Sequence, residues 1–256
     1  TSAIWSDART LVITLSTTTA LPTVAVGDTI TLNGTTITDT LGNNSTTVTF
    51  SNITGTFSDD TTPPTITARD SFDLDGDGYI DAVRVTFSKA INDSTVNSAN
   101  FTLTGGVTLN PFSSTTNGDV ANNNIIYLTF TDGILLTDAI PTLTYTPGSL
   151  KDLPGNPLGS SSASITDTAG PAILSAVASD QTVIITGIDN DDTVTITFSE
   201  NTNQPAITSV NINSVLQLSG GHTWLDGSNN ITSAIWSDAR TLVITLSTTT
   251  ALPTVA

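Results

Sequence analysis

The sequence predicts an all-β protein built from repeated units, and two observations carry this prediction. Thr and Val, which favour strands, and Asn, Asp and Gly, which favour turns, dominate a chain with 11% charged and 5% aromatic residues. Residues 1–25 also recur letter for letter at 232–256, an offset of 231. Unbroken identity of this length indicates copied sequence, so we expect the chain to be a window on a tandem array.

The charge pattern excludes one class of function and favours a cofactor. The net charge is −17, whereas nucleic-acid binding needs a basic surface. Only one of the 23 acidic residues is Glu (Glu200), and the rest are Asp, the short carboxylate of turns and of calcium loops.

Cysteine is absent, and no apolar run approaches the ~18 residues of a membrane span. We therefore expect Ca²⁺ as cofactor, no nucleic-acid partner and no membrane span in this window.

Short strand-like runs separated by polar turns continue through the chain. They are expected at residues 10–15, 29–32, 35–38 and 46–50, then at 65–68, 82–87, 101–104, 125–130, 142–146 and 162–165, and finally at 173–177, 182–186, 193–198, 210–212 and 215–218. Asn33-Gly34 predicts a hairpin between 29–32 and 35–38. Pro63-Pro64 and Gly170-Pro171 mark two boundaries, because proline does not continue a sheet interior.

Internal similarity groups these runs into related domains. Residues 85–88 match 196–199, and the turn Asp152-x-x-Gly-Asn156 matches Asp39-x-x-Gly-Asn43. We expect residues 1–61 to be the C-terminal half of one domain, 62–171 to be a complete domain and 172–256 to be the N-terminal part of the next. Strands of this length and spacing predict tandem immunoglobulin-like β-sandwich domains of Greek-key type.

One motif predicts a metal site. In Asp73-Leu-Asp75-Gly-Asp77-Gly-Tyr79-Ile-Asp81, carboxylates at alternate positions converge when the backbone curls. The Tyr79 carbonyl and Asp81 would supply further oxygens, and Asp70 an additional ligand. The position of the bidentate Glu of an EF-hand is Arg84, which excludes a helix–loop–helix site. The alternative is an acidic turn without an ion, although clustered carboxylates would then repel one another.

A shorter acidic run gives a second candidate metal site. Its residues are Asp189, Asp191 and Asp192, with Glu200 as a further ligand, and the alternative is a tight polar turn. Near the boundaries, Asp59, Asp60 and Asp167 are candidates for calcium that stiffens a joint. The Asp39 and Asp152 turns are interpreted as structural.

No sequence motif for catalysis is evident, so we expect no enzyme and assign no catalytic residue. His222 and Trp224 lie in the Gly-rich stretch Gly220–Ser228, where a single His is more often a loop residue than a functional group.

The runs TPPTITARDSFDLDGDGYIDAVRVTFSKAINDSTVNSANFTL and YTPGSLKDLPGNPLGSSSASITDTAGPAI resemble bacterial Ig-like domains of the type found in S-layer proteins and giant surface adhesins. The resemblance implies an extracellular, cell-surface protein without enzymatic activity. It also implies a calcium site at Asp73, Asp75, Asp77 and Asp81.

Together these observations predict a structural surface protein, a calcium-stabilised array that forms a stalk, a fibre or an S-layer-like coat. The alternative is an adhesin that recognises glycans or other cells through apical loops such as Gly220–Ser228. An ice-binding Thr face is disfavoured, because Thr is scattered over both strand faces. Since two identical strand pairs cannot fill one slot, we expect neighbouring repeats or identical chains to complete the split domain by strand complementation.

Overall fold

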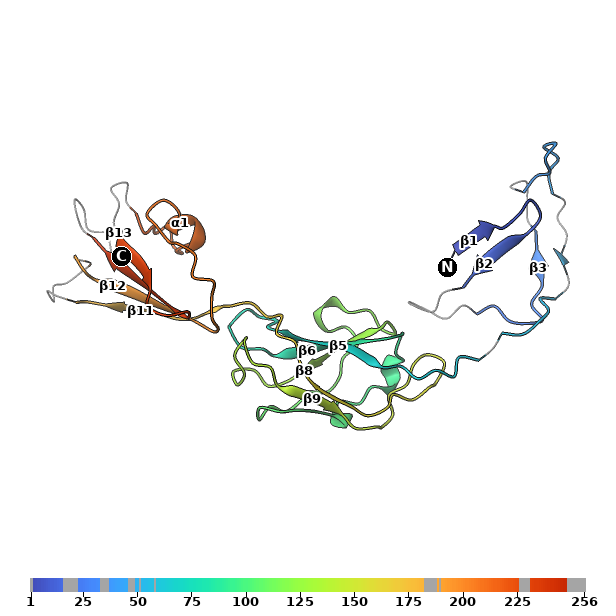
Figure 1. Ribbon diagram of the computed structural model, residues 1–256, viewed down its shortest axis with the longest axis horizontal. Coiled ribbons are helices and arrows are strands. Elements are labelled where there is room, and N and C mark those ends of the chain that lie inside the picture. Colours follow the sequence, from blue (N-terminus) through green and yellow to red (C-terminus); the bar gives the residue numbers. More distant parts are fainter. Residues whose placement is uncertain are drawn as a thin grey trace.

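The computed structural model describes residues 2–15, 23–32, 37–45, 49–50, 52–57, 59–181, 188, 190–225 and 231–247. The chain forms antiparallel sheets, which confirms the all-β prediction. Figure 1 shows the strands in three bodies that follow one another along the chain. They are named here the N-terminal segment (2–57), the middle segment (59–171) and the C-terminal segment (172–247).

The elements of each segment are as follows. The N-terminal segment contains β1 (Ser2–Trp5), β2 (Leu11–Thr14), β3 (Ile30–Thr31) and β4 (Thr49–Phe50). The middle segment contains β5 (Ile66–Phe72), β6 (Ala82–Phe87), β7 (Phe101–Leu103), β8 (Ile125–Thr129), β9 (Thr142–Tyr145), β10 (Ser161–Ser164) and short 3-10 helices at Asp93–Thr95, Ser98–Asn100 and Thr116–Gly118. The C-terminal segment contains β11 (Ile173–Ser179), β12 (Thr193–Phe198), α1 (Ile212–Val215), β13 (Ile231–Trp236) and β14 (Thr241–Leu246).

The middle segment is held together by one core that two sheets share. One sheet has the order β5-β6-β8 and the other β10-β9-β7. Inward-facing side chains alternate along the strands, so that Val83 and Val85 of β6 and Leu143 and Tyr145 of β9 all belong to the same buried cluster. The buried Tyr145 hydroxyl accepts a hydrogen bond from the Gly148 N–H at 3.0 Å, which satisfies its polar end.

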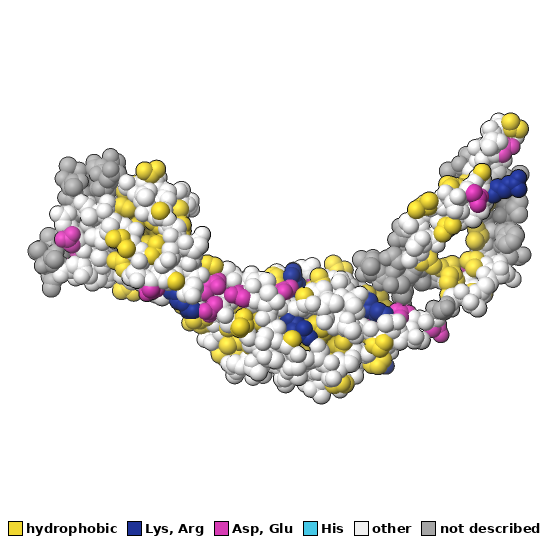
Figure 2. Space-filling model, in the orientation of Figure 1, with side chains coloured by type: hydrophobic (Ala, Val, Ile, Leu, Met, Phe, Trp, Pro, Cys, Tyr) yellow, Lys and Arg dark blue, Asp and Glu magenta, His cyan; other side chains and the backbone are white. Residues whose placement is uncertain are grey.

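The C-terminal segment has a single four-stranded sheet among its described residues, in the order β11-β12-β14-β13. One face packs against α1 and the chain that follows it, around Ile196, Ile212, Leu242 and Ile244. Figure 2 shows apolar side chains at the surface of this segment and of the N-terminal segment. The described part of the chain contains no helix with the length and apolar content needed to cross a membrane.

The middle and C-terminal segments repeat the same strand pairing. Ile66 of β5 lies opposite Phe87, and Ile173 of β11 lies opposite Phe198; a register shift follows both pairs. The third strand is also in the same register, because β8 pairs with β6 as β14 pairs with β12. The similarity detected between residues 85–88 and 196–199 therefore extends to the geometry of three strands.

The duplicated sequence forms the same hairpin twice, in two different environments. Ala3 pairs with Ile13 in the first copy, and Ala234 pairs with Ile244 in the second. Ile244 is fully buried because β14 also pairs with β12, whereas Ile13 is 57% exposed in the two-stranded β1–β2 ribbon. The copies thus differ in their neighbours and not in their own fold.

Three strand predictions need comment. The runs 210–212 and 215–218 were expected as strands, but the chain forms the one-turn helix α1 there. Among the described residues, β3 pairs with β4, and part of the predicted hairpin between 29–32 and 35–38 lies outside the described residues. Asn33-Gly34 itself and the predicted strand 182–186 lie outside the described residues.

Candidate metal centre at a joint between segments

The predicted metal loop connects β5 to β6 and curls around Asp73. The Oδ1 of Asp73 accepts a hydrogen bond from the Gly76 N–H at 2.7 Å, and its Oδ2 accepts one from the Gly78 N–H at 2.9 Å. Asp81 closes the loop, since its Oδ1 accepts from the Leu74 N–H at 3.0 Å. Gly76 and Gly78 both have positive φ, which permits the tight curl.

Three carboxylates of the loop converge as the spacing predicts. One oxygen from each of Asp73, Asp75 and Asp77 lies within 4.8 Å of the other two. Calcium binds oxygens at about 2.3–2.6 Å, so ligands on opposite sides of one ion stand roughly 5 Å apart. The chemistry of this donor set, hard carboxylate oxygens in a partly exposed loop, suits a divalent cation such as Ca²⁺.

Two more carboxylates act on this loop electrostatically. Burial, and secondarily the charges of Asp75, Asp132 and Asp73, raise the pKa of Asp81 to about 6. Burial also raises the pKa of Asp132, and the charges of Asp77, Asp75 and Asp73 raise it further. Asp132 belongs to the turn after β8, far from the motif in sequence, and it adds negative charge that a cation would neutralise.

The structure gives contacts for two other predicted ligand residues. Asp70 lies on β5, where its Oδ2 accepts from the Arg84 guanidinium at 2.7 Å. Its place is therefore in an ion pair across the β5–β6 ladder, not in the loop. Tyr79 forms a β-bridge with Leu136, and its N–H donates to Asp77 Oδ1 at 2.9 Å.

The structure does not bring the second predicted metal site together. Asp189 lies outside the described residues, while Asp191 has a positive φ and Asp192 is buried at the start of β12. Glu200 follows the far end of that strand, about 20 Å or more along an extended chain. The charges acting on Glu200 come from Asp167, Asp138 and Arg240. The prediction that Glu200 joins Asp191 and Asp192 is therefore wrong.

Glu200 lies instead where the middle and C-terminal segments meet. The buried hydroxyls of Thr137 and Ser199 are 2.6 Å apart, and Arg240 forms an ion pair with Asp138. Burial raises the pKa of Glu200, and the charge of Asp167 raises it further. Polar contacts between the two segments thus lie around the buried carboxylate of Glu200.

The metal loop itself takes part in this joint. A Cβ atom placed on Gly78 would stand 2.8 Å from Leu174 Cδ2 and 3.1 Å from Ser199 Cβ, so the loop backbone packs directly on the C-terminal segment. The loop also reaches the turn after β8, because the Thr137 N–H donates to the Gly78 carbonyl at 3.2 Å. The carboxylate cluster and the joint therefore share one piece of backbone.

An ion pair holds the incoming linker to the middle segment. Lys89 Nζ lies 2.7 Å from Asp60 Oδ2 and 3.5 Å from the buried Asp152. The Asn156 side-chain amide also donates to the Asp60 carbonyl at 2.7 Å. Asp60 thus has a cationic partner, whereas Asp59 is simply exposed.

The remaining predicted linker residue, Asp167, accepts a hydrogen bond from the Ser71 hydroxyl at 3.5 Å.

The two D-x-x-G-N turns are built alike. Asp39 Oδ1 accepts from the Asn43 N–H at 2.8 Å, and Asp152 Oδ1 accepts from the Asn156 N–H at 2.6 Å. Each Asn side chain donates to the other oxygen of the same carboxylate. The structural interpretation of both turns agrees with this geometry.

The loop proposed for adhesion is only partly described, since residues 226–228 lie outside the described residues. His222 is exposed. Trp224 Nε1 donates to the Leu216 carbonyl at 2.6 Å, and its ring lines an apolar pocket over the β12 face. Trp224 therefore belongs to the packing of the segment.

Comparison of the chain with protein-family models, with curated proteins and with solved structures finds no match.

Proposed function

We propose that this chain is part of a structural, extracellular surface protein, a tandem array of immunoglobulin-like sandwiches stabilised by Ca²⁺, which forms a stalk, fibre or S-layer-like coat. The observation that carries this proposal is the repetition of one strand-pairing register in consecutive segments. A chain that repeats the same unit gains length and mechanical continuity, which is what an extended surface structure needs.

The position of the Asp73–Asp81 loop supports a mechanical role for calcium. An ion held by Asp73, Asp75 and Asp77 would neutralise charges that otherwise repel one another and would fix the loop. Because Gly78 packs on Leu174 and Ser199, a fixed loop also restrains the joint to the next segment. Calcium would thereby limit bending between successive units.

Thermal unfolding of the full chain in millimolar Ca²⁺ and in chelator tests this proposal. A ligand that binds only the folded state stabilises it by about 2.7 kcal/mol when its free concentration is 100-fold above Kd. We expect a higher melting temperature in Ca²⁺ for the transition of the middle segment. Asp75→Ala should abolish the increase while changing the melting temperature in chelator little, because Asp75 is exposed.

Asp59→Ala is the matched control, since it removes one exposed carboxylate outside the loop. This variant should keep the full response to Ca²⁺. An equal loss for Asp75→Ala in Ca²⁺ and in chelator would remove the ion from the mechanism.

A further inference from the structure

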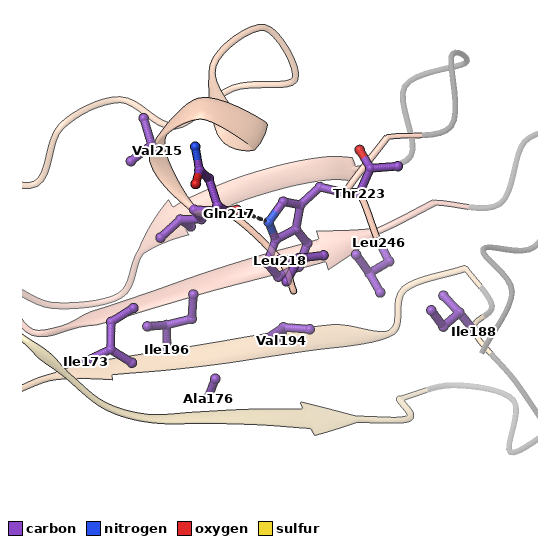
Figure 3. A pocket seen from close by; sticks show the side chains of 12 residues that line it. Ile173, Ala176, Ile188, Val194, Ile196, Val215, Gln217, Leu218, Thr223 and Leu246 are labelled. Carbon is purple, nitrogen blue, oxygen red and sulfur yellow. Dashed lines mark hydrogen bonds between the residues drawn. The ribbon is translucent and has the colours of Figure 1, made fainter. Parts of the chain in front are cut away.

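The C-terminal segment carries an apolar groove on the sheet face beneath α1. The groove has a volume of about 480 Å³ and is lined by the strand residues Ile173, Ala176, Val194 and Ile196, and by Leu218 and Trp224 from the chain after α1. Figure 3 shows Ile173, Ala176, Val194 and Ile196 along the sheet, below the segment that carries Val215 and Leu218. The sheet thus forms one wall of the groove, and the chain after α1 forms another.

The middle segment shows what covers the corresponding face in a finished unit. There, β6 is equivalent to β12, and its side chains Val83 and Val85 share a core with Leu143 of β9 and Leu150. These two leucines are 1% and 0% exposed. The sheet that contains β9 and β10 therefore fills the place that the groove leaves open.

The N-terminal segment contains a strand pair of the same kind. Ile30 lies opposite Phe50 and Thr31 opposite Thr49 in the β3–β4 pair. In the β9–β10 pair, Leu143 lies opposite Ala163 and Thr144 opposite Ser162. Adding 113 to each residue number of the first pair gives the second pair without any change of register.

The turn after each of these strands also coincides at the same offset. The Ser45 N–H donates to the Ile37 carbonyl at 2.9 Å, and the Leu158 N–H donates to the Leu150 carbonyl at 3.0 Å. The isolated bridge Thr38–Asn44 likewise matches Lys151–Pro157. The described parts of residues 30–50 thus reproduce the backbone of β9, its turn and β10.

The apolar side chains of this region are nevertheless exposed. Ile30 and Ile37 are 56% and 38% exposed, although their equivalents Leu143 and Leu150 are buried. Exposed apolar surface of this kind, next to a strand pair in a known register, indicates a surface that another part of a structure covers. The N-terminal segment therefore carries a strand pair with exposed apolar side chains, and the C-terminal segment carries a groove of the kind that such a pair covers in the middle segment.

We propose that the groove of one chain receives residues 23–57 of a second copy of the chain, so that β3 and β4 complete the C-terminal segment as β9 and β10 complete the middle segment. The donor is a second copy because the middle segment separates the two halves of one chain. The preceding linker is held at Asp60 by Lys89, and the following one continues from β10 through a bridge between Asp70 and Thr166. Figure 1 shows these two connections leaving opposite ends of the middle segment.

The net gain comes from residues 23–57 and not from the hairpin. Because β1–β2 and β13–β14 have the same sequence and register, replacing one by the other changes no contact of β12. Whichever copy of the hairpin lies beside β12, association newly buries Ile30 and Ile37. The inference rests on the repeat arrangement of the proposed array and on none of its calcium ligands.

Single-cysteine reactivity in the full chain tests the proposal, since the chain has no other cysteine. Ile37→Cys should react rapidly with a thiol reagent at low protein concentration and become protected as concentration rises, in parallel with association measured by sedimentation velocity. Leu41→Cys is the matched control on the same segment. Leu41 is 86% exposed, and its equivalent Pro154 is exposed in the finished unit, so this cysteine should stay reactive throughout.

A second pair of variants tests the contact itself. Ile30→Asp, at a side chain already exposed in the free chain, should abolish both the association and the protection of the thiol introduced by Ile37→Cys, whereas Leu41→Asp should change neither. High reactivity of that thiol at all protein concentrations would overturn the proposal. Protection at all concentrations would also overturn it, because a single chain would then close on itself. If association fails while Ca²⁺ still stabilises the middle segment, only this inference falls; if association persists without any Ca²⁺ response, only the calcium mechanism falls.

Discussion

Asp93 is a buried carboxylate whose two oxygens have no hydrogen-bond partner in the described structure, although the residue is only 8% exposed. Burial raises its pKa, and the charge of Asp119 raises it further. Because the folded-state pKa lies above the value of about 3.9 for an unfolded chain, the folded state binds this proton more tightly. The loss of stability caused by ionising Asp93 in the folded protein is absent below about pH 4. It grows between that pH and the folded-state pKa, and it is constant above the folded-state pKa.

Asp93→Asn should therefore raise the melting temperature of the middle segment at pH 7, because an amide carries no charge to desolvate. At pH 3 the gain should disappear. Thermal unfolding in chelator at the two pH values measures it, with Asp59→Asn as an exposed control that should show no pH-dependent gain. A gain of equal size at both pH values would contradict the electrostatic explanation.

The sequence predicts the convergence of the carboxylates within the loop, but it does not predict the approach of the distant Asp132. Alternate carboxylates at Asp73, Asp75 and Asp77 are visible as a pattern, because a short loop determines their proximity. Asp132 carries no such signal, since only the pairing of β8 with β6 brings its turn to the loop. Sequence distance alone also does not show that Asp70 faces Arg84 across the β5–β6 ladder.

At the scale of elements, the loop between β5 and β6 links the cluster of Asp73, Asp75 and Asp77 to the joint. Gly76 and Gly78 have similar backbone conformations, with φ of +81° and +98°, but different surroundings. A Cβ atom on Gly76 would meet nothing within 4 Å, whereas one on Gly78 would press on Leu174 and Ser199. Substitutions at the two glycines therefore distinguish the cost of backbone strain from the cost of a clash between segments.

Gly76→Ala should cost about 1 kcal/mol of stability, because an L residue is strained at positive φ. Gly78→Ala should cost at least about 1 kcal/mol more, owing to overpacking against Leu174, and should loosen the joint. Thermal unfolding compares the two losses, and limited proteolysis of residues 166–172 detects the loosening. Equal losses with no change in proteolysis would show that Gly78 does not couple the loop to the joint.

Strand positions were well predicted where apolar residues alternate over five or more residues, as in β6, β8 and β12. The failure at α1 has a local cause. Ile212, Val215 and Leu216 are spaced three and four apart, which is helical spacing, but the run is too short for periodicity to decide. The Asn211 Oδ1 accepts from the Thr208 N–H at 2.7 Å and holds the turn that begins the helix.

At the scale of the whole molecule, two of the six positively charged residues form ion pairs at the connections between segments. The chain has only six Lys and Arg residues against 23 acidic ones. Lys89 pairs with Asp60 at the connection before the middle segment, and Arg240 pairs with Asp138 at the one after it. Each exposed pair contributes about 1 kcal/mol or less, so these contacts add little to stability.

The internal similarity in the sequence has a structural counterpart, because β5–β6–β8 and β11–β12–β14 pair in a common register. The sequence did not show which copy of the hairpin is buried. Identical residues have identical propensities, so the neighbouring strand β12 and the chain packed on the sheet distinguish Leu242, 1% exposed, from Leu11, 40% exposed.

The duplicated hairpin also makes the molecule its own internal standard. Peptides 3–15 and 234–246 have one sequence and therefore one mass, yet β14 lies inside a four-stranded sheet and β2 in a two-stranded ribbon. In hydrogen–deuterium exchange followed by mass spectrometry, this single peptide should split into two isotope envelopes of equal intensity, one exchanging fast and one slowly. Since both envelopes come from the same molecule at the same moment, their separation measures what a neighbouring strand contributes to protection, free of any difference in sequence or solvent.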